Sequence, residues 1–351
     1  MSSNVSFVAG EDDQLPASAS LAAREHIAAI VRHAFEHGSD DPALVVFDQQ
    51  CELARVLAQS YQHCLPQATM MQFELTPPEQ VLAAIEILPA GALVVLVQSS
   101  NFRLGAYRIR VELFKRGLKV IEHPHLNRMP GQEMQHYIAS LAYDPAYYRG
   151  VGNALKAKID AASHGVVDSG GAQLVFGGRF EPAKLNVGDY REMKNIGGQF
   201  PIGEVFTESV DLADVNGSVR VFVFGDTSFL VNHPPVPITL IVKEGQVVDA
   251  LDSTPEFDAV LAKIRQDEGV VWVRELGFGM NRAFSKDCMV SDIGTYERMC
   301  GVHLSLGAKH GSYGKPHIKR GEGRYHIDVF ADTHSVRLGD DEVYRDGRWV
   351  V

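Results

Sequence analysis

Apolar residues in the first half of the chain change period repeatedly, and this pattern predicts alternating strands and helices. Short apolar runs predict strands at Ala43–Phe47, Met70–Phe73, Ala92–Val97 and Lys119–Glu122. Apolar residues at helical spacing predict helices at Ser20–His37, Cys51–Cys64, Pro78–Ile87 and Tyr107–Arg116. This alternation is typical of a parallel sheet with crossover helices, so we expect an α/β N-terminal domain.

The pattern changes after two further predicted helices, Gly131–Ala142 and Ala146–Ala162. From Gly165 onward, short β-rich segments alternate with Gly, Asp and Asn turns. The predicted elements are strands at Gln173–Phe176, Val219–Phe224 and Ile238–Val242, a helix at Pro255–Gln266 and a hairpin around Asp346-Gly347. We therefore expect a mixed α+β C-terminal domain, with domains at residues 1–164 and 165–351 and the boundary near His164.

Composition narrows the classes of partner. A chain of 351 residues is long enough for two domains, and 45% hydrophobic with 22% charged residues is typical of a globular protein. The net charge of -11 argues against nucleic acid or an anionic membrane as the main partner. The most apolar run, Ala83–Gln98, contains Glu86 and Pro89 and is too short to span a bilayer. A short peptide or another small molecule is the expected substrate.

Cysteine usage and the leader bear on location. The four cysteines form no CxxC pair, so we expect reduced thiols and a cytoplasmic protein. The first twenty residues include Glu11, Asp12 and Asp13 and lack the basic and apolar regions of a signal peptide.

Two common enzyme motifs are missing from the sequence. The first strand-to-helix turn, Phe47–Cys51, has no glycine, which argues against a nicotinamide or flavin cofactor on the first domain. Ser305 and Ser312 lie near histidines, but the chain has no Gly-x-Ser-x-Gly turn, so a serine hydrolase is not favoured.

Candidate metal ligands gather in the second half. His326 and Asp328 lie two apart in a predicted strand, so their side chains would point to the same face. His303, Glu204 and Glu275 would complete a site for Zn, Mn, Co or Fe. Each has another interpretation: the His326 strand resembles a half-solvated sheet face, Glu204 suits a solvated strand entrance, and Glu275 follows an apolar run and would pair with neighbouring Arg274.

A second pair of histidines, His123 and His125, flanks Pro124 in the first domain. A turn is the simpler account of this segment, although its histidines would also suit a role in reaching substrate.

Four segments of the second half, taken in order, resemble the aminopeptidase T family of thermophilic leucyl-type metalloaminopeptidases. They are Asn195–Thr207, Arg274–Asn281, Gly294–Gly307 and His326–Asp328, with Gly170–Arg179 as a further similar segment upstream. The resemblance implies a dinuclear site with five ligands: Glu204, Glu275, His303, His326 and Asp328. A family tyrosine falls on His310 here, with Tyr313 three residues later, so either residue is a candidate for that position.

The resemblance implies hydrolysis of a peptide or small amide by a homodimer. Two divalent ions, Zn, Co or Mn, would activate a water molecule. Glu204 or Glu275 would carry its proton to the leaving amine, Tyr313 is a further candidate catalytic residue, and Asp332 or His334 would orient the imidazoles.

A different reaction class remains open. The same fold family resembles ring-cleaving dioxygenases that act on dihydroxypyridines, which hold a single Fe(II) with histidine and carboxylate ligands. A metal-binding protein without catalytic activity is a third interpretation.

Overall fold

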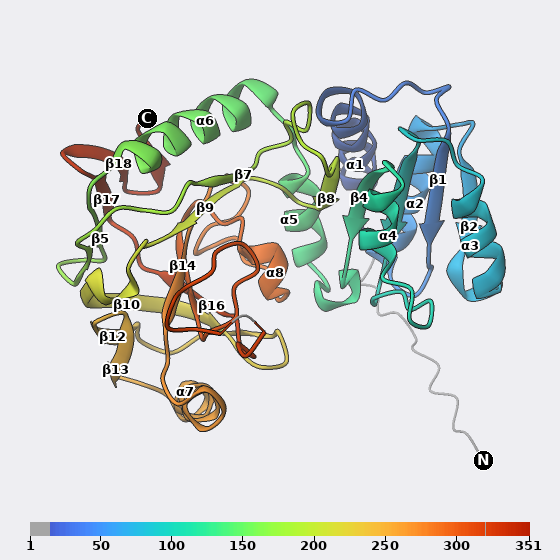
Figure 1. Cartoon of the computed structure of the whole chain (residues 1–351). Helices are drawn as coiled ribbons and strands as arrows, with labels where there is room; N and C mark the ends of the chain where they lie inside the picture. The colour runs from blue at the N-terminus through green and yellow to red at the C-terminus, as the bar shows by residue number, and fades with distance from the viewer. Residues whose placement is uncertain (1–14, 320) are drawn as a thin grey trace, which may run out of the picture. The chain divides into compact units, whose positions relative to one another are not determined.

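The computed structural model describes residues 15–319 and 321–351, so the acidic leader at Glu11–Asp13 lies outside the described residues (Figure 1). The chain forms two units: Met1–Tyr143 with Gly188–Pro201, and Asp144–Val187 with Ile202–Val351. This division differs from a boundary at His164 in two ways. Helix α6 (Pro145–Ala161) belongs to the second unit, and residues 188–201 return to the first.

Within the described residues, the first unit contains a five-stranded parallel sheet in the order β2-β1-β3-β4-β8. Its strands are β1 (Ala43–Phe47), β2 (Thr69–Gln72), β3 (Leu93–Val97), β4 (Lys119–His123) and β8 (Gly197–Gln199). Strand β3 is buried along its whole length, as expected for a Val- and Leu-rich strand covered on both faces. The predicted parallel sheet is present, with one strand contributed by the returning segment.

Helices connect these strands and cover the sheet (Figure 1). They are α1 (Ala17–Ala29), which continues as a π-helix (Ile30–Ala34), α2 (Glu52–Cys64), α3 (Pro78–Glu86), α4 (Ile109–Lys115) and α5 (Glu133–Ser140), with 3-10 turns at Phe73–Leu75 and Leu126–Arg128. Helix α2 packs Leu53, Leu57 and Tyr61 inward from one face, as its apolar spacing predicts.

Buried polar side chains form hydrogen bonds at the carboxyl ends of β1 and β4. Asp48 accepts hydrogen bonds from the backbone N–H of Ser99, at 2.7 Å, and from the Ser99 hydroxyl. His123 is fully buried with each ring nitrogen 2.7 Å from a tyrosine hydroxyl, those of Tyr61 and Tyr137, and burial lowers its pKa to about 3. His123 is therefore a neutral, hydrogen-bonded core residue.

The second unit contains a large, mainly antiparallel sheet in the order β19-β18-β17-β5-β6-β10-β16-β15-β14-β9-β7, with β11 and β12 pairing to β10 and β13 pairing to β12. The strands are β5 (Gly165–Asp168), β6 (Gln173–Phe176), β7 (Lys184–Asn186), β9 (Glu204–Glu208), β10 (Val215–Gly225), β11 (Val231–Asn232), β12 (Ile238–Lys243), β13 (Gln246–Leu251), β14 (Val273–Gly279), β15 (Gly301–Leu306), β16 (Ile327–Ala331), β17 (Ser335–Leu338), β18 (Asp341–Arg345) and β19 (Arg348–Trp349). The mixed α+β texture predicted for this half is observed.

The helices of the second unit are α6, α7 (Pro255–Glu268) and α8 (Ile293–Tyr296), with a 3-10 turn at Leu212–Asp214. Helix α7 begins where the sequence indicates a start. The Thr254 hydroxyl accepts from the N–H of Phe257, Pro255 occupies the first turn, and Gly269 ends the helix with φ 84°.

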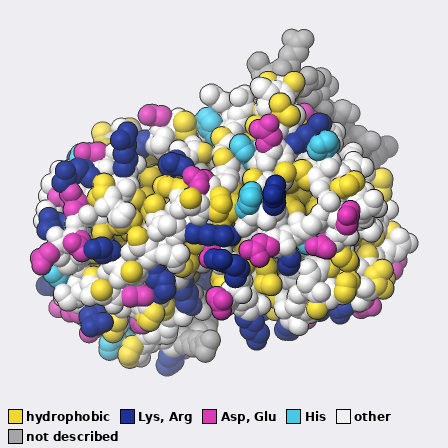
Figure 2. Space-filling view, turned by 90° about the horizontal axis from the view of Figure 1, so that it is seen from above, with side chains coloured by type: hydrophobic (Ala, Val, Ile, Leu, Met, Phe, Trp, Pro, Cys, Tyr) yellow, Lys and Arg dark blue, Asp and Glu magenta, His cyan; other side chains and the backbone are white. Residues whose placement is uncertain are grey.

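On the face shown in Figure 2, acidic and basic side chains are interspersed. Among the described residues, no helix is both long enough and apolar enough to cross a membrane.

Candidate metal centre

Strand register brings four of the candidate ligands to one face of the sheet. Strands β9, β14, β15 and β16 are neighbours in the sheet, of which Figure 1 labels β9, β14 and β16. Paired residues on neighbouring strands point to the same face. His303 pairs with Gly277, and Glu204 pairs with Gly279. Two-residue steps along β14 and β15 add the remaining positions: Glu275 is two before Gly277, and Asp328 pairs with Ser305.

Gly277 provides the space for the imidazole of His303. A Cβ atom at position 277 would overlap the ring of His303, which lies directly over this glycine. His303 is itself almost fully buried. The absence of a side chain at 277 therefore sets where the imidazole lies.

Glu204, Glu275 and His303 form a compact cluster whose ligand-type atoms all lie within 4.8 Å of one another. His303 Nε2 is 3.2 Å from Glu204 Oε1 and 3.4 Å from Glu275 Oε1. All three residues are buried. Two carboxylate oxygens and one imidazole nitrogen thus face one another.

The other oxygen of each glutamate is bound elsewhere. Arg298 donates to Glu204 Oε2 at 2.8 Å, and His310 Nε2 lies 2.7 Å from Glu275 Oε2. These contacts fix the orientation of both carboxylates, so that their Oε1 atoms point toward His303. Such outer contacts orient ligands in metal sites.

His326 immediately precedes β16, and Asp328 is the second residue of that strand. His326 Nε2 is 3.2 Å from Asp328 Oδ1, in agreement with the same-face spacing of the two residues. The ring of His326 is 6.0 Å from that of His310, measured between centroids. Ile327, between them, is buried at the start of the strand.

The chemistry of these residues fits a divalent cation. Imidazole nitrogens and carboxylate oxygens are the ligands that Zn, Mn, Co and Fe accept. His303 Nε2 and Asp328 Oδ1 are buried and, apart from the ion-pair contacts at 3.2–3.4 Å described above, make no hydrogen bond of good geometry with the described residues. Buried polar atoms rarely lack a well-formed hydrogen bond, so these two atoms support a cation there.

The raised pKa values of two histidines show that the carboxylates of this cluster favour a positive charge beside them. Burial opposes protonation of His303, but the carboxylates of Glu204 and Glu275 beside it raise its pKa well above the ordinary value. Burial likewise opposes protonation of His326, yet Asp328 and other carboxylates raise its pKa to about 10. A cation among these groups would satisfy the same negative charge.

A buried ion-pair network anchors the loop that carries His310. The Arg274 guanidinium binds both carboxylate oxygens of Glu208 and also donates to the backbone carbonyls of Ala308, at 2.6 Å, and Tyr313, at 3.0 Å. Lys315, two residues after Tyr313, binds Glu181 at 2.7 Å. The alternative interpretation of Glu275, a salt bridge with Arg274, is therefore wrong, because Arg274 pairs with Glu208 and Glu275 contacts His303 and His310.

The structure separates His310 from Tyr313 as candidates for the family tyrosine position. His310 lies against Glu275, whereas the Tyr313 hydroxyl donates to the carbonyl of Pro182 at 2.8 Å. The Tyr313 ring packs against His310, with centroids 5.2 Å apart. His310 therefore presents a ligand-type atom to the cluster, while the Tyr313 hydroxyl is held by the backbone.

Sequence reasoning missed Arg298 and Glu297. Arg298 Nη1 bridges Glu204 and Glu297, at 2.8 and 2.6 Å. Burial and the negative charge of Asp328 raise the pKa of Glu297 to about 8. A charged pair between apolar Tyr296 and Met299 was the available signal.

Two residues expected to orient the imidazoles have other contacts. Asp332 forms an ion pair with Lys286, and the backbone N–H of His334 donates to the carbonyl of Asp168. Both line a separate cavity, together with Phe222 and Lys286, that includes none of the proposed ligands.

Comparison with known proteins gives a structural likeness and no sequence match. No family model matches the chain, and no curated protein matches it significantly. Wild-type AmpT from Thermus thermophilus has a similar structure, with a TM-score of 0.58 over 94% of this chain and 99% of that chain. The two sequences are 14% identical, so the likeness supports an aminopeptidase T-like fold.

Replacing Gly277 by alanine tests the space beneath His303. The added methyl group would displace the imidazole, so we expect affinity for Co²⁺, followed by its visible absorbance, to fall about 10–100-fold. Gly150→Ala on helix α6, where an added Cβ meets open space, is the matched control and should bind as wild type does. Equal affinity in Gly277→Ala and wild type would contradict the geometry described here.

Proposed function

We propose that the protein is a metal-dependent hydrolase of the aminopeptidase type that cleaves a peptide or small amide bond. The observation that carries this proposal is the buried cluster of Glu204, Glu275 and His303, with two carboxylate oxygens directed at one imidazole nitrogen. The likeness of the fold to AmpT, an aminopeptidase T, supports the choice of reaction. A cytoplasmic homodimer acting on short substrates belongs to the same proposal.

The proposed ligands form two groups. Glu204, Glu275 and His303 would hold one ion, and His326 with Asp328 would contribute to a second, with His310 nearby. Bound divalent ions, Zn, Co or Mn, would lower the pKa of a water molecule and polarise the substrate carbonyl.

Among the protein's own groups, Glu275 is better suited than Glu204 to move a proton. The second oxygen of Glu275 contacts His310, whose ring nitrogens can exchange protons, at 2.7 Å. The second oxygen of Glu204 contacts Arg298, which stays protonated. We therefore assign Glu275 as the carrier of the proton from water to the leaving amine, and Glu204 as a ligand fixed by Arg298.

His310 and Tyr313 take different roles in this proposal. His310 holds the second oxygen of Glu275, and Tyr313 supports the His310 ring from the side. Tyr313 would act on the position of His310 and not on substrate, because its hydroxyl is held by a backbone carbonyl.

Metal content is the direct test. We expect elemental analysis of protein purified without chelator to find two divalent ions per chain, because the described cluster offers ligands in two groups. Chelator should remove hydrolysis of short peptides, and Zn²⁺, Co²⁺ or Mn²⁺ should restore it.

The rival chemistry gives a different result in the same experiment. One iron per chain, with consumption of dioxygen in the presence of a dihydroxypyridine, would replace the hydrolase by a ring-cleaving dioxygenase. Absence of bound metal and of both activities would refute the proposed enzyme altogether.

Two neighbouring substitutions separate a ligand role from a packing role. Ile327→Ala removes a buried side chain, so the metal-free protein should lose about 2–5 kcal/mol of unfolding free energy while retaining its metal-binding residues. His326→Ala should lose bound metal and activity with a smaller change in the stability of the metal-free protein, because its side chain is partly exposed.

Both variants require metal analysis together with thermal unfolding after chelator treatment. If His326→Ala keeps its full metal content and the wild-type rate, the pair of His326 and Asp328 is a polar sheet face and holds no catalytic ion.

A further inference from the structure

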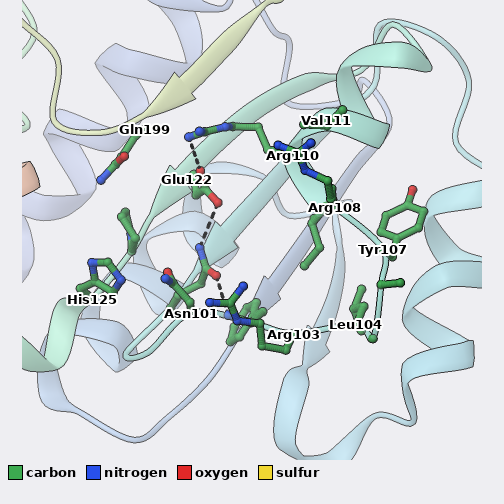
Figure 3. A pocket seen from close by; sticks show the side chains of 16 residues that line it. Asn101, Arg103, Leu104, Tyr107, Arg108, Arg110, Val111, Glu122, His125 and Gln199 are labelled. Atoms are coloured by element: carbon green, nitrogen blue, oxygen red, sulfur yellow. Dashed lines mark hydrogen bonds and ion pairs between the residues drawn. The ribbon is translucent and has the colours of Figure 1, made fainter. Parts of the chain in front are cut away.

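A cavity of about 380 Å³ lies within the first unit, at the carboxyl ends of β3 and β4 (Figure 3). Its walls come from the loop that follows β3, the start of α4, the residues after β4, and Gln199 at the end of β8. The carboxyl-end side of a parallel sheet is the side on which open α/β sheets bind ligands. The volume is at the lower end of the range for small-molecule sites, about 300–1,000 Å³.

The cavity concentrates positive charge in an acidic chain. Arg103, Arg108 and Arg110 line it against a single carboxylate, Glu122, although the chain carries a net charge of -11. Arg110 is paired with Glu122 at 2.8 Å, as the dashed line in Figure 3 shows. Arg103 and Arg108 form no ion pair with any residue that the structure describes. Two guanidinium groups are therefore available to a ligand.

The loop that carries these arginines is anchored from below. Phe102 and Leu104 are buried, and the ring of Phe102 stacks on Phe73 with centroids 4.1 Å apart. The side-chain oxygen of buried Gln98 accepts from the N–H of Phe102 at 2.9 Å. Leu104 and Tyr107 form a β-bridge that closes the turn. The backbone that carries Arg103 and Arg108 is therefore already ordered, so less conformational entropy is lost when a ligand binds.

The His123-Pro-His125 segment contributes one wall. His123 is used inside the core by two tyrosine hydroxyls, whereas His125, with φ 55°, lines the cavity. Gln98, Asn101 and Gln199 add amide groups around it. The lining therefore combines cationic and neutral hydrogen-bond donors.

We propose that this cavity binds a small organic anion through Arg103 and Arg108, with a carboxylate or phosphate group on one or both guanidinium groups and the rest of the molecule in the cavity. Planar guanidinium groups match both of these head groups, because each presents two parallel donors. All residues of the site belong to the first unit, and it shares no residue with the metal centre. It does not depend on the proposed hydrolase activity.

Calorimetric titration of the full-length protein at constant ionic strength tests the proposal. The probes are inorganic phosphate, succinate and succinamide, the uncharged diamide of succinate. We expect phosphate, succinate or both to bind and succinamide not to bind. Binding of one anion alone identifies the head group, and binding of neither anion overturns the proposal.

Paired variants locate the binding site. Arg103→Gln with Arg108→Gln should weaken anion binding at least about tenfold, because it removes the charge-assisted hydrogen bonds. Arg24→Gln with Arg32→Gln, two exposed positions in the first helical segment of the same unit, makes the same change in net charge and should bind as wild type does. If the variant with Arg103→Gln and Arg108→Gln binds the anion with wild-type affinity, the assignment is overturned. This includes the case in which the anion binds at the metal centre instead. Circular dichroism of both pairs establishes that each is folded.

Discussion

Buried negative charge is the constraint on which the second unit depends. Glu204, Glu275 and Asp328 are all buried on one face of the sheet, and an unpaired buried carboxylate costs several kcal/mol. Elsewhere in the same unit a buried carboxylate is neutralised by the protein's own cations, since Glu208 is bound by Arg274 and lies 3.8 Å from Lys315. At the candidate centre the permanent charge of Arg298 is shared between two glutamates. Among the described residues, the remaining negative charge of these carboxylates is balanced only by nearby imidazoles, and a bound cation would neutralise it.

Long-range pairing explains how four separate segments deliver these groups to one place. Antiparallel register places His303 opposite Gly277 and Glu204 opposite Gly279. Side chains that point to one face of a strand therefore lie beside those that point to the same face of the next strand. A shift of one residue in either pair would turn the ligands to the other face. The site is thus specified by the same hydrogen bonds that build the sheet, and the apolar residues on its opposite face, such as Leu304 and Val329, hold that register.

The sequence predicts local features well and pairwise partners poorly. Period and spacing predict most strands and helices of the first unit, and the two-residue spacing of His326 and Asp328 agrees with their 3.2 Å separation. Strand β8, by contrast, reads Gly197-Gly-Gln199 and has no apolar or β-branched residue, so its return to the first sheet leaves no local signal. The partnership of Arg274 with Glu208 spans 66 residues and depends on strand pairing that local spacing does not encode.

A β-bulge in strand β14 allows this buried strand to carry two adjacent charged residues, Arg274 and Glu275. In a regular strand Arg274 and Glu275 would point to opposite faces, and at least one charge would enter an apolar layer. Pairing with β15 advances three residues on β14, from Val273 to Leu276, against two on β15, which is a β-bulge. The bulge lets Arg274 reach Glu208 while Glu275 reaches the histidines. The hydroxyl of Ser305 accepts from the N–H of Glu275 at 3.0 Å, so this backbone donor keeps a partner where the ladder is interrupted. A serine that suggested hydrolase chemistry beside His303 thus supports the backbone of a proposed ligand.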